Sequence, residues 1–136
     1  MMAYLLDTCV VSDFVKGEQN TLKQIKLISP RDLFISSLTV MEIKYGLAIN
    51  PAKAIKIQPL IETFLISITV LNFTLQEAEK AAEIRSILKI AGSPIGSYDV
   101  LIAATALSHN LMIITSNVRE FQRVPNLQIE NWRFPE

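Results

Sequence analysis

The stretch AYLLD, residues 3–7, is an uninterrupted apolar run that ends abruptly in a carboxylate. An apolar run of this length is typical of a strand that is buried inside a sheet. Three further runs of the same kind, at residues 33–35, 68–71 and 111–114, predict three more strands, and residues 128–132 predict a late one. The chain therefore has the strands for a small central sheet.

The segments between these strands have the spacing of amphipathic helices, because their apolar residues recur every three or four positions. We expect Gly17 and Gly92 to end the helices that precede them, and Pro51 to end another. Pro59 is expected in the first turn of the next helix or at a kink in it. Strands alternating with helices need crossover connections, so the sequence predicts an α/β fold with a mainly parallel sheet of four to five strands. The predicted helices span residues 10–16, 21–27, 39–49, 55–65, 74–90 and 99–108.

The composition limits the classes of protein to which the chain can belong. It has 136 residues, 50% of them hydrophobic, with a mean hydropathy of +0.33 and a formal net charge of +0. These values predict a single domain over residues 1–136 and exclude a disordered chain. A balanced charge offers no broad basic footprint for nucleic acid, so any affinity for RNA must come from a local patch, a metal ion or a dimer groove.

Several residue types that define other classes of protein are scarce. The lone cysteine, Cys9, excludes an intrachain disulfide and fits a reducing cytoplasm. Because Asp7 interrupts the apolar N-terminus, neither a signal peptide nor a membrane span is expected. The lone histidine, His109, excludes a His-rich zinc site, and the chain has neither a G-x-S-x-G motif nor a Gly-rich phosphate loop.

Acidic side chains follow the predicted strands. Asp7 directly follows the first strand, Glu42 lies early in the helix after the second, and Asp99 begins a buried helix. Asn117 and Glu120 follow the fourth strand. The carboxyl ends of parallel strands share one edge of a sheet, where carboxylates brought together repel one another unless a cation lies between them. Because Mg²⁺ and Mn²⁺ prefer oxygen ligands, the pattern indicates metal-assisted hydrolysis of a phosphodiester.

Each of these acids also has a purely structural interpretation. Asp7 and Asp99 could cap the helices that follow them. Residues 39–42, TVME, match the S/T-x-x-E capping box, and so do residues 74–77, TLQE, for which no catalytic role is expected. Glu120 could form a solvated ion pair with the neighbouring arginine. The sequence leaves these interpretations open.

Four segments resemble the PIN-domain family, and within it the VapC toxins of toxin–antitoxin pairs. They are YLLDTCVVS at residues 4–12, SSLTVMEIKYG at 36–46, YDVLIAATA at 98–106 and ITSNVREF at 114–121. The resemblance implies a three-layer α/β/α fold, Mg²⁺- or Mn²⁺-dependent endoribonuclease activity and inhibition by a cognate antitoxin.

Carried over residue by residue, Asp7, Glu42 and Asp99 match the acidic triad of that family. Two positions depart from it. Cys9 stands where many members have asparagine, and the fourth acidic position is divided between Asn117, which is also a plausible turn residue, and Glu120.

The resemblance suggests a role for each acid. Asp7 and Asp99 are expected to hold the metal ion, and Glu42 to orient or deprotonate the attacking water. Thr8 and Thr115 are candidate hydrogen-bond supports for these carboxylates. Three basic side chains are candidates for contacts with RNA phosphates: Lys44, Arg85 and Arg119.

Three alternative functions remain open. A structure-specific DNA nuclease would use a similar acidic site, although the small chain leaves little room to thread DNA. A phosphoacceptor receiver domain also places an aspartate at a strand end, but no lysine follows residues 111–114. A non-catalytic protein-binding module would keep the fold without the activity. The high apolar content predicts a homodimer, and the helices near residues 20–65 could dock an antitoxin segment whose arginine blocks the carboxylates.

Overall fold

The computed structural model describes residues 2–134 and contains a sheet in which each neighbouring pair of strands is parallel. The strand order is β3-β2-β1-β4-β5, so the first and fourth strands of the chain are neighbours at the centre. This confirms the predicted parallel sheet, with five strands. The strands are β1 (Tyr4–Leu6), β2 (Leu33–Ser36), β3 (Thr69–Leu71), β4 (Met112–Ile114) and β5 (Ile129–Glu130).

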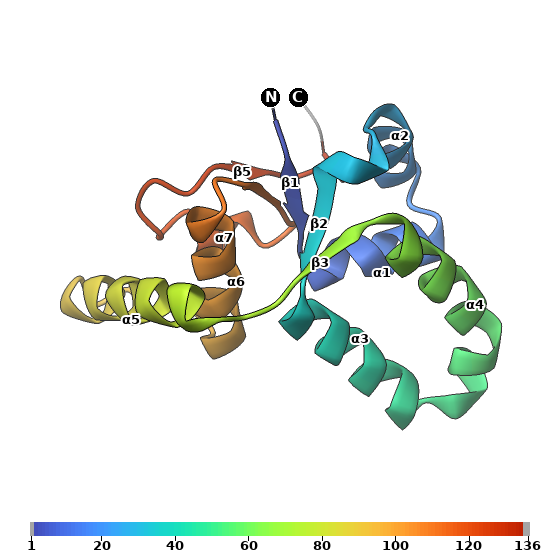
Figure 1. The fold of residues 1–136 in the computed structure, drawn as a ribbon, viewed down its shortest axis with the longest axis horizontal. Helices are drawn as coiled ribbons and strands as arrows, with labels where there is room; N and C mark the ends of the chain where they lie inside the picture. The colour runs from blue at the N-terminus through green and yellow to red at the C-terminus, as the bar shows by residue number, and fades with distance from the viewer. Residues whose placement is uncertain (1, 135–136) are drawn as a thin grey trace.

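Helices cover both faces of the sheet, which gives the expected three layers (Figure 1). One face carries α5, α6 and α7, and the other carries the helices of the first half of the chain. Their bounds are α1 (Thr8–Lys16), α2 (Gln19–Leu27), α3 (Ser37–Ile49), α4 (Pro51–Ser67), α5 (Leu75–Ile90), α6 (Ser97–Ser108) and α7 (Val118–Phe121). None of the helices within residues 2–134 combines the length and apolarity needed to cross a bilayer.

Alternating side chains of the central strands divide the core into two clusters. Leu5 and Ile113 point to the layer of α5 and α6, while Leu6, Ile35 and Ile114 point to the layer of α1, α3 and α4. All five side chains have no exposed surface. The period of two along a strand explains why these runs are apolar throughout: a central strand must be apolar on both faces.

Helix ends account for most differences from the predicted bounds. Gly17 ends α1 with a left-handed φ of 79°, and Gly92 follows α5 with a φ of 70°, as expected. The helix before Pro51 ends at Ile49, as expected, and Pro51 also begins α4, where proline fits because the first helical residue needs no hydrogen-bonded N–H. Pro59 lies in the interior of α4, which is longer than predicted. The short helix α7 was not predicted.

Residues 132 and 133 contact the first helices of the chain. Trp132 is 2% exposed and packs in the same cluster as Leu6. The Arg133 guanidinium donates from Nε to Oδ2 of the buried Asp13 at 3.1 Å, and Asn20 Nδ2 donates to the Arg133 carbonyl at 2.9 Å. These contacts fix α1, which begins at the carboxyl end of β1.

Candidate active site

The candidate site lies at the carboxyl ends of β1 and β4, the two central strands. Asp7 directly follows β1, and its backbone N–H donates to the carbonyl of Ile114 at 3.0 Å. Thr115 directly follows β4 and has no exposed surface. The sheet thus brings together residues that are 108 positions apart in the sequence. In Figure 1, β1 descends towards α1, and α3 and α6 begin near the same edge.

A chain of hydrogen bonds joins Glu42 to Asp7. The Thr8 hydroxyl donates to Oε1 of Glu42 at 3.0 Å, while the Thr8 backbone N–H donates to Oδ1 of Asp7 at 2.9 Å. The other Asp7 oxygen, Oδ2, accepts from the Thr115 hydroxyl at 2.9 Å. Both threonines expected to support the carboxylates therefore do so.

The chain of hydrogen bonds continues from Thr115 to Asp99 and Glu120. The Asn117 backbone N–H donates to the Thr115 hydroxyl at 3.0 Å. The Asn117 side-chain Nδ2 donates to Glu120 Oε2 at 2.6 Å and lies 3.5 Å from Asp99 Oδ2. All five candidate residues thus belong to one network, although they come from four separate parts of the chain.

Crowding of negative charge is strongest at Asp99. Desolvation, a hydrogen bond with Glu120 and the charges of Asp7, Glu120 and Glu42 raise the pKa of Asp99 from 3.8 to about 7. Hydrogen bonds from Asn117 and from Asp99 lower the pKa of Glu120. The two shifts describe one proton shared by a pair, which stays on Asp99 while Glu120 is ionised.

Asp7 is held in a buried position between donors. Its side chain is 8% exposed, and this burial raises its pKa, although the hydrogen bonds from Thr115, Thr8 and Cys9 act in the opposite direction. A buried carboxylate that accepts several hydrogen bonds has a fixed orientation. Asp7 therefore offers a preorganised oxygen at the strand end.

The structure decides between the open interpretations of these acids. Asp7 is the N-cap of α1, which confirms its structural interpretation, and it is also a member of the network, so the cap leaves a functional role open to it. The capping box at residues 39–42 is wrong: Ser36 caps α3, the buried Thr39 hydroxyl has no hydrogen-bond partner, and Glu42 accepts from Thr8. The comparable motif at residues 74–77 does form a capping box.

Neither Asp99 nor Glu120 has the expected structural role. The N-cap of α6 is Gly96, and no side chain caps that helix. Glu120 is held by Asn117 and Asp99, and no ion pair joins it to Arg119 within residues 2–134, so the expected pair with Arg119 is not what positions it. Both acids are thus left to interact with each other.

Sequence reasoning missed several contacts in the site. Cys9 Sγ lies 3.7 Å from Asp7 Oδ2 and 3.6 Å from Thr115 Oγ1, and it accepts from the Ser116 N–H at 3.4 Å. Gly96 lies against the acids: a Cβ placed on it would be 3.1 Å from Asp99 Oδ2. Only the position of Cys9, two residues after Asp7, gave any signal in the sequence.

The donor set suits a hard divalent cation better than any other group. It consists of four carboxylates with no histidine, and burial, together with the neighbouring carboxylates, raises the pKa of Asp99. Mg²⁺ and Mn²⁺ prefer such oxygen ligands. Within residues 2–134, no group of three His, Cys, Asp or Glu side chains is already arranged to hold a metal ion. An ion here would keep several water ligands, as Mg²⁺ ordinarily does.

The three basic candidates lie outside the hydrogen-bonded network. Lys44 is exposed on α3, Arg85 on α5 and Arg119 on α7. They lie on three different helices, so these three candidates do not form one basic patch.

Comparisons with known proteins agree with this geometry. The sequence model of the PIN domain family matches residues 4–127 of the chain. The tRNA(fMet)-specific endonuclease VapC of Salmonella typhimurium is 32% identical over 134 residues, which are 97% of this chain and 99% of that protein. The crystal structure of VapBC2 from Rickettsia felis, bound to a promoter DNA fragment, contains a chain with a TM-score of 0.88 and 30% identity. The alignment covers 96% of this chain and 99% of that chain.

A second solved structure, the DNA-bound VapBC of Salmonella typhimurium, also has a TM-score of 0.88, at 34% identity over 97% of this chain and 99% of that chain. Sequence and structure thus agree over nearly the whole length, including the segments that carry Asp7, Glu42, Asp99 and Glu120. The chain belongs to the PIN-domain family, and within that family to the VapC group.

Proposed function

We propose that the chain is a divalent-metal-dependent endoribonuclease and the toxin of a toxin–antitoxin pair. The observation that supports this most is the continuous hydrogen-bonded network that joins Glu42, Asp7, Asn117, Asp99 and Glu120. The relatives of the chain include proteins named as ribonucleases, such as VapC2 of Rickettsia felis at 32% identity. The proposal takes residues 1–136 as one nuclease domain that acts in the cytoplasm.

In this proposal Asp7 and Asp99 hold Mg²⁺ or Mn²⁺. The bound ion supplies a positive charge that stabilises the negative charge developing on the scissile phosphate. Asp7 is suited to the role because Thr8 and Thr115 fix both of its oxygens. Asp99 is suited because a cation lowers its raised pKa and thereby keeps it ionised at neutral pH.

Glu42 is the proposed general base. Its Oε1 accepts a hydrogen bond from the Thr8 hydroxyl, which leaves Oε2 to orient a water molecule and accept its proton. Asn117 and Glu120 are positioning residues: the Asn117 amide holds Glu120, and Glu120 in turn contacts Asp99. Lys44 and Arg119 are proposed to attract the RNA phosphates to the site.

The test is cleavage of RNA by the purified chain with and without divalent ions. Asp7→Asn, Glu42→Gln and Asp99→Asn are each expected to lower kcat/KM at least 100-fold in Mg²⁺. The matched control is Asp32→Asn, outside the network, which is expected to retain full activity. Undiminished cleavage by Asp7→Asn or Asp99→Asn in Mg²⁺ refutes the assignment.

Two further measurements separate the alternative functions. RNA and flapped DNA are compared side by side as substrates, and faster cleavage of the flapped DNA contradicts the ribonuclease proposal. A titration with Mg²⁺ should raise Tm, because an ion that binds only the folded chain stabilises it. Absence of both cleavage and stabilisation points to a non-catalytic member of the family.

We propose that the antitoxin binds in a groove that lies between α1, α3 and α4 and has a volume of about 360 Å³. We call it the antitoxin groove. Thr8 and Glu42 line it together with apolar side chains, so the groove opens directly onto the acidic network. Lys16 and Lys53 also line it. An amphipathic segment can bury its apolar face there, and an arginine on it can reach Glu42 as a bidentate partner. The apolar lining consists of Val11, Val15, Ile43, Leu47, Ile49, Ile57 and Ile61.

Gly46 provides a specific test of this groove. It lines the groove, and nothing lies within 4 Å of a Cβ placed on it, so a larger side chain fits without disturbing the fold. Gly46→Phe is expected to keep ribonuclease activity but to escape inhibition by the cognate antitoxin. Gly46→Ala is the control and should remain inhibited. Full inhibition of Gly46→Phe contradicts this docking site.

A homodimer completes the proposal. Several large apolar side chains are exposed on helices near the site, including Tyr45 at 63% and Tyr98 at 52% exposure. Light scattering tests the prediction directly, and a monomer at high protein concentration contradicts it.

A further inference from the structure

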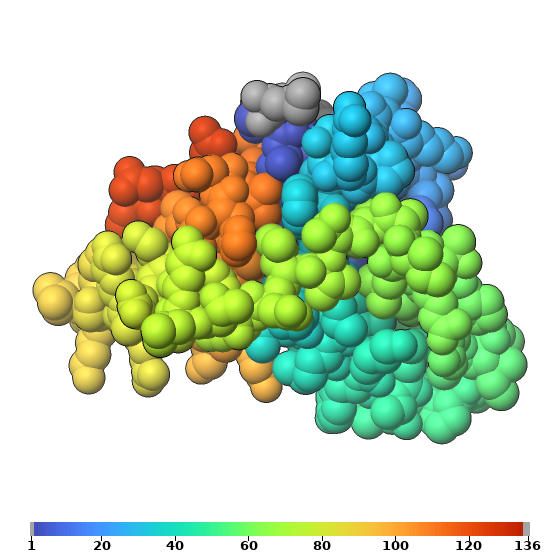
Figure 2. Space-filling model, viewed as in Figure 1, coloured from blue at the N-terminus to red at the C-terminus, as the bar shows by residue number. Residues whose placement is uncertain are grey.

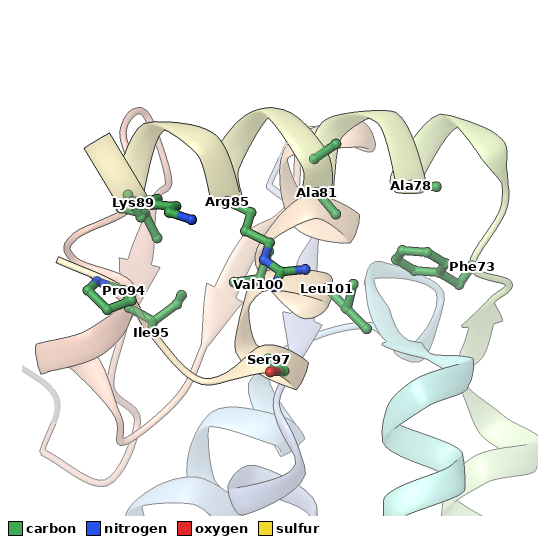
Figure 3. A pocket seen from close by; sticks show the side chains of 12 residues that line it. Phe73, Ala78, Ala81, Arg85, Lys89, Pro94, Ile95, Ser97, Val100 and Leu101 are labelled. Atoms are coloured by element: carbon green, nitrogen blue, oxygen red, sulfur yellow. The ribbon is translucent and has the colours of Figure 1, made fainter. Parts of the chain in front are cut away.

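A further groove lies outside the acidic network, between α5 and the first turns of α6 (Figure 3). Its volume is about 760 Å³, which is within the range of sites that bind small molecules or nucleotides. Most of its wall is apolar, with Phe73 at one end and Pro94 and Ile95 at the other. Neither the ribonuclease site nor the antitoxin groove described above includes it.

Two cations enter this groove from α5. Arg85 and Lys89 are one helical turn apart and both exposed, and no ion pair involves either within the part of the chain that the structure describes. Figure 3 shows Arg85 extending from α5 towards Val100 and Leu101, with Lys89 near Pro94. No acidic side chain lines the groove among residues 2–134, so it is locally positive in a chain with no net charge.

The combination of cations with an apolar and aromatic wall matches one class of ligand. Single-stranded nucleic acid is bound by positive side chains that follow its phosphates and by apolar or aromatic surfaces that contact its bases. The antitoxin groove contains a carboxylate, Glu42, that a basic protein side chain can meet, whereas no carboxylate lines this groove among residues 2–134. The groove therefore fits a single RNA strand by charge and by surface chemistry.

One short loop separates the groove from the acidic network. Pro94, Ile95 and Ser97 line the groove, while Gly96 between them lies close enough to the acids that a Cβ on it would be 3.1 Å from Asp99 Oδ2, and its backbone N–H lowers the pKa of Glu120. Ser97, Val100 and Leu101 lie on the groove side of α6, and Asp99 lies on the other side of the same turn. Since a helix is about 10–12 Å across, a strand that passes over the start of α6 reaches both.

We propose that the α5–α6 groove binds the RNA strand next to the scissile phosphate, with Arg85 and Lys89 on phosphates and the apolar wall against a base. The inference rests on the ribonuclease function proposed above and adds a binding subsite to it. Arg85 and Lys89 act as positioning residues, since neither touches the acids that are proposed to carry the reaction.

The experiment uses single-stranded RNAs that the parent cuts at one position, shortened from each end one nucleotide at a time. For the parent, kcat/KM is expected to fall in a step of roughly tenfold when the nucleotide that occupies the groove is removed. For the double variant Arg85→Ala/Lys89→Ala, kcat/KM should already be roughly tenfold lower with the long RNA and should not fall further when the same nucleotide is removed. Arg31→Ala, an exposed cation remote from both grooves, is the control and should keep the step.

Two further measurements make the test specific. Loss of two phosphate contacts should reduce the slope of log(kcat/KM) against log[salt] by about 1.4, at about 0.7 for each contact with a single strand. Ala82→Trp, an exposed position that lines the groove, blocks it without changing its charge and should also remove the step.

The possible results separate this inference from the function on which it rests. If the parent cuts no RNA, the proposed function is refuted. If the parent cuts RNA and the double variant and Ala82→Trp retain the step, the groove assignment alone is refuted. If these substitutions change the oligomeric state and leave the step intact, a second copy of the chain occupies the groove, which also refutes the assignment.

Discussion

Replacing Asp99 by asparagine should make the ion-free protein more stable while abolishing its activity. The pKa of Asp99 rises from 3.8 to about 7 in the folded chain. At about 1.4 kcal/mol for each pKa unit, the shift corresponds to roughly 4 kcal/mol. Asp99 is only partly buried and shares its proton with Glu120, so solvent screening reduces the expected gain to about 1–2 kcal/mol.

The gain should depend on pH with a definite sign. Because the pKa of Asp99 is higher in the folded chain than in the unfolded chain, the folded state binds more protons between pH 4 and pH 7. The free energy of unfolding of the parent therefore falls as pH rises through this range. Asparagine removes that loss, so Asp99→Asn gains little near pH 4 and its full 1–2 kcal/mol at pH 8.

Urea denaturation in EDTA at pH 4.5 and pH 8 measures this difference, with Asp32→Asn as the control for an aspartate outside the network. In saturating Mg²⁺ the order should reverse, because the parent gains stability from the ion and the variant does not. A variant that is less stable than the parent at pH 8, or equally stabilised at both pH values, would falsify the electrostatic account of this site.

Three other substitutions test features of the same structure. Gly96→Ala places a methyl group 3.1 Å from Asp99 Oδ2, so ribonuclease kcat should fall roughly tenfold while the unfolding free energy changes by less than about 0.5 kcal/mol. His109→Ala removes the contact of 3.4 Å to the buried Glu77 and should lower the unfolding free energy by about 1 kcal/mol in urea. Thr39→Val removes a buried hydroxyl without a partner and should raise it by about 1 kcal/mol.

Each of these predictions has its own contrary outcome. Unchanged kcat for Gly96→Ala means that the loop does not position Asp99, and Gly46→Ala, with open space around it, controls for glycine replacement itself. A His109→Ala variant as stable as the parent indicates that the contact of His109 with Glu77 Oε2 adds no stability beyond the hydrogen bonds from Thr74 to Oε1. If Thr39→Val instead lowers the unfolding free energy by about 1 kcal/mol, the Thr39 hydroxyl does have a partner, and the capping box at residues 39–42 becomes the better interpretation.

The sheet and the meeting of the acids could be predicted because both depend on local patterns. Runs such as residues 3–6 and 111–114 are too short and too apolar for surface helices, and intervening helices force parallel pairing. Parallel strands then place whatever follows them at one edge. The expectation that Asp7 and Thr115 lie at the same edge of the sheet follows from this rule alone.

Choices between neighbouring candidates could not be predicted. Ser36, Ser37 and Thr39 are all acceptable helix caps, and Ser36 is selected because β2 ends there. Once that choice is made, Glu42 lies too far into α3 to reach the helix start and faces Thr8 instead. The sharing of a proton by Asp99 and Glu120 depends on α7, whose four residues carry no periodic pattern.

The order of strands in the sheet has a consequence for synthesis of the chain. The central neighbour of β1 is β4, and Thr115 lies 108 positions after Asp7, so Thr115, Asn117 and Glu120 are made long after β1. A nascent or prematurely terminated chain therefore lacks the groups that orient Asp7 and pair with Asp99. During synthesis, the hydrogen bonds that orient Asp7 and pair with Asp99 can therefore form only after β4 and residues 115–120 have been made.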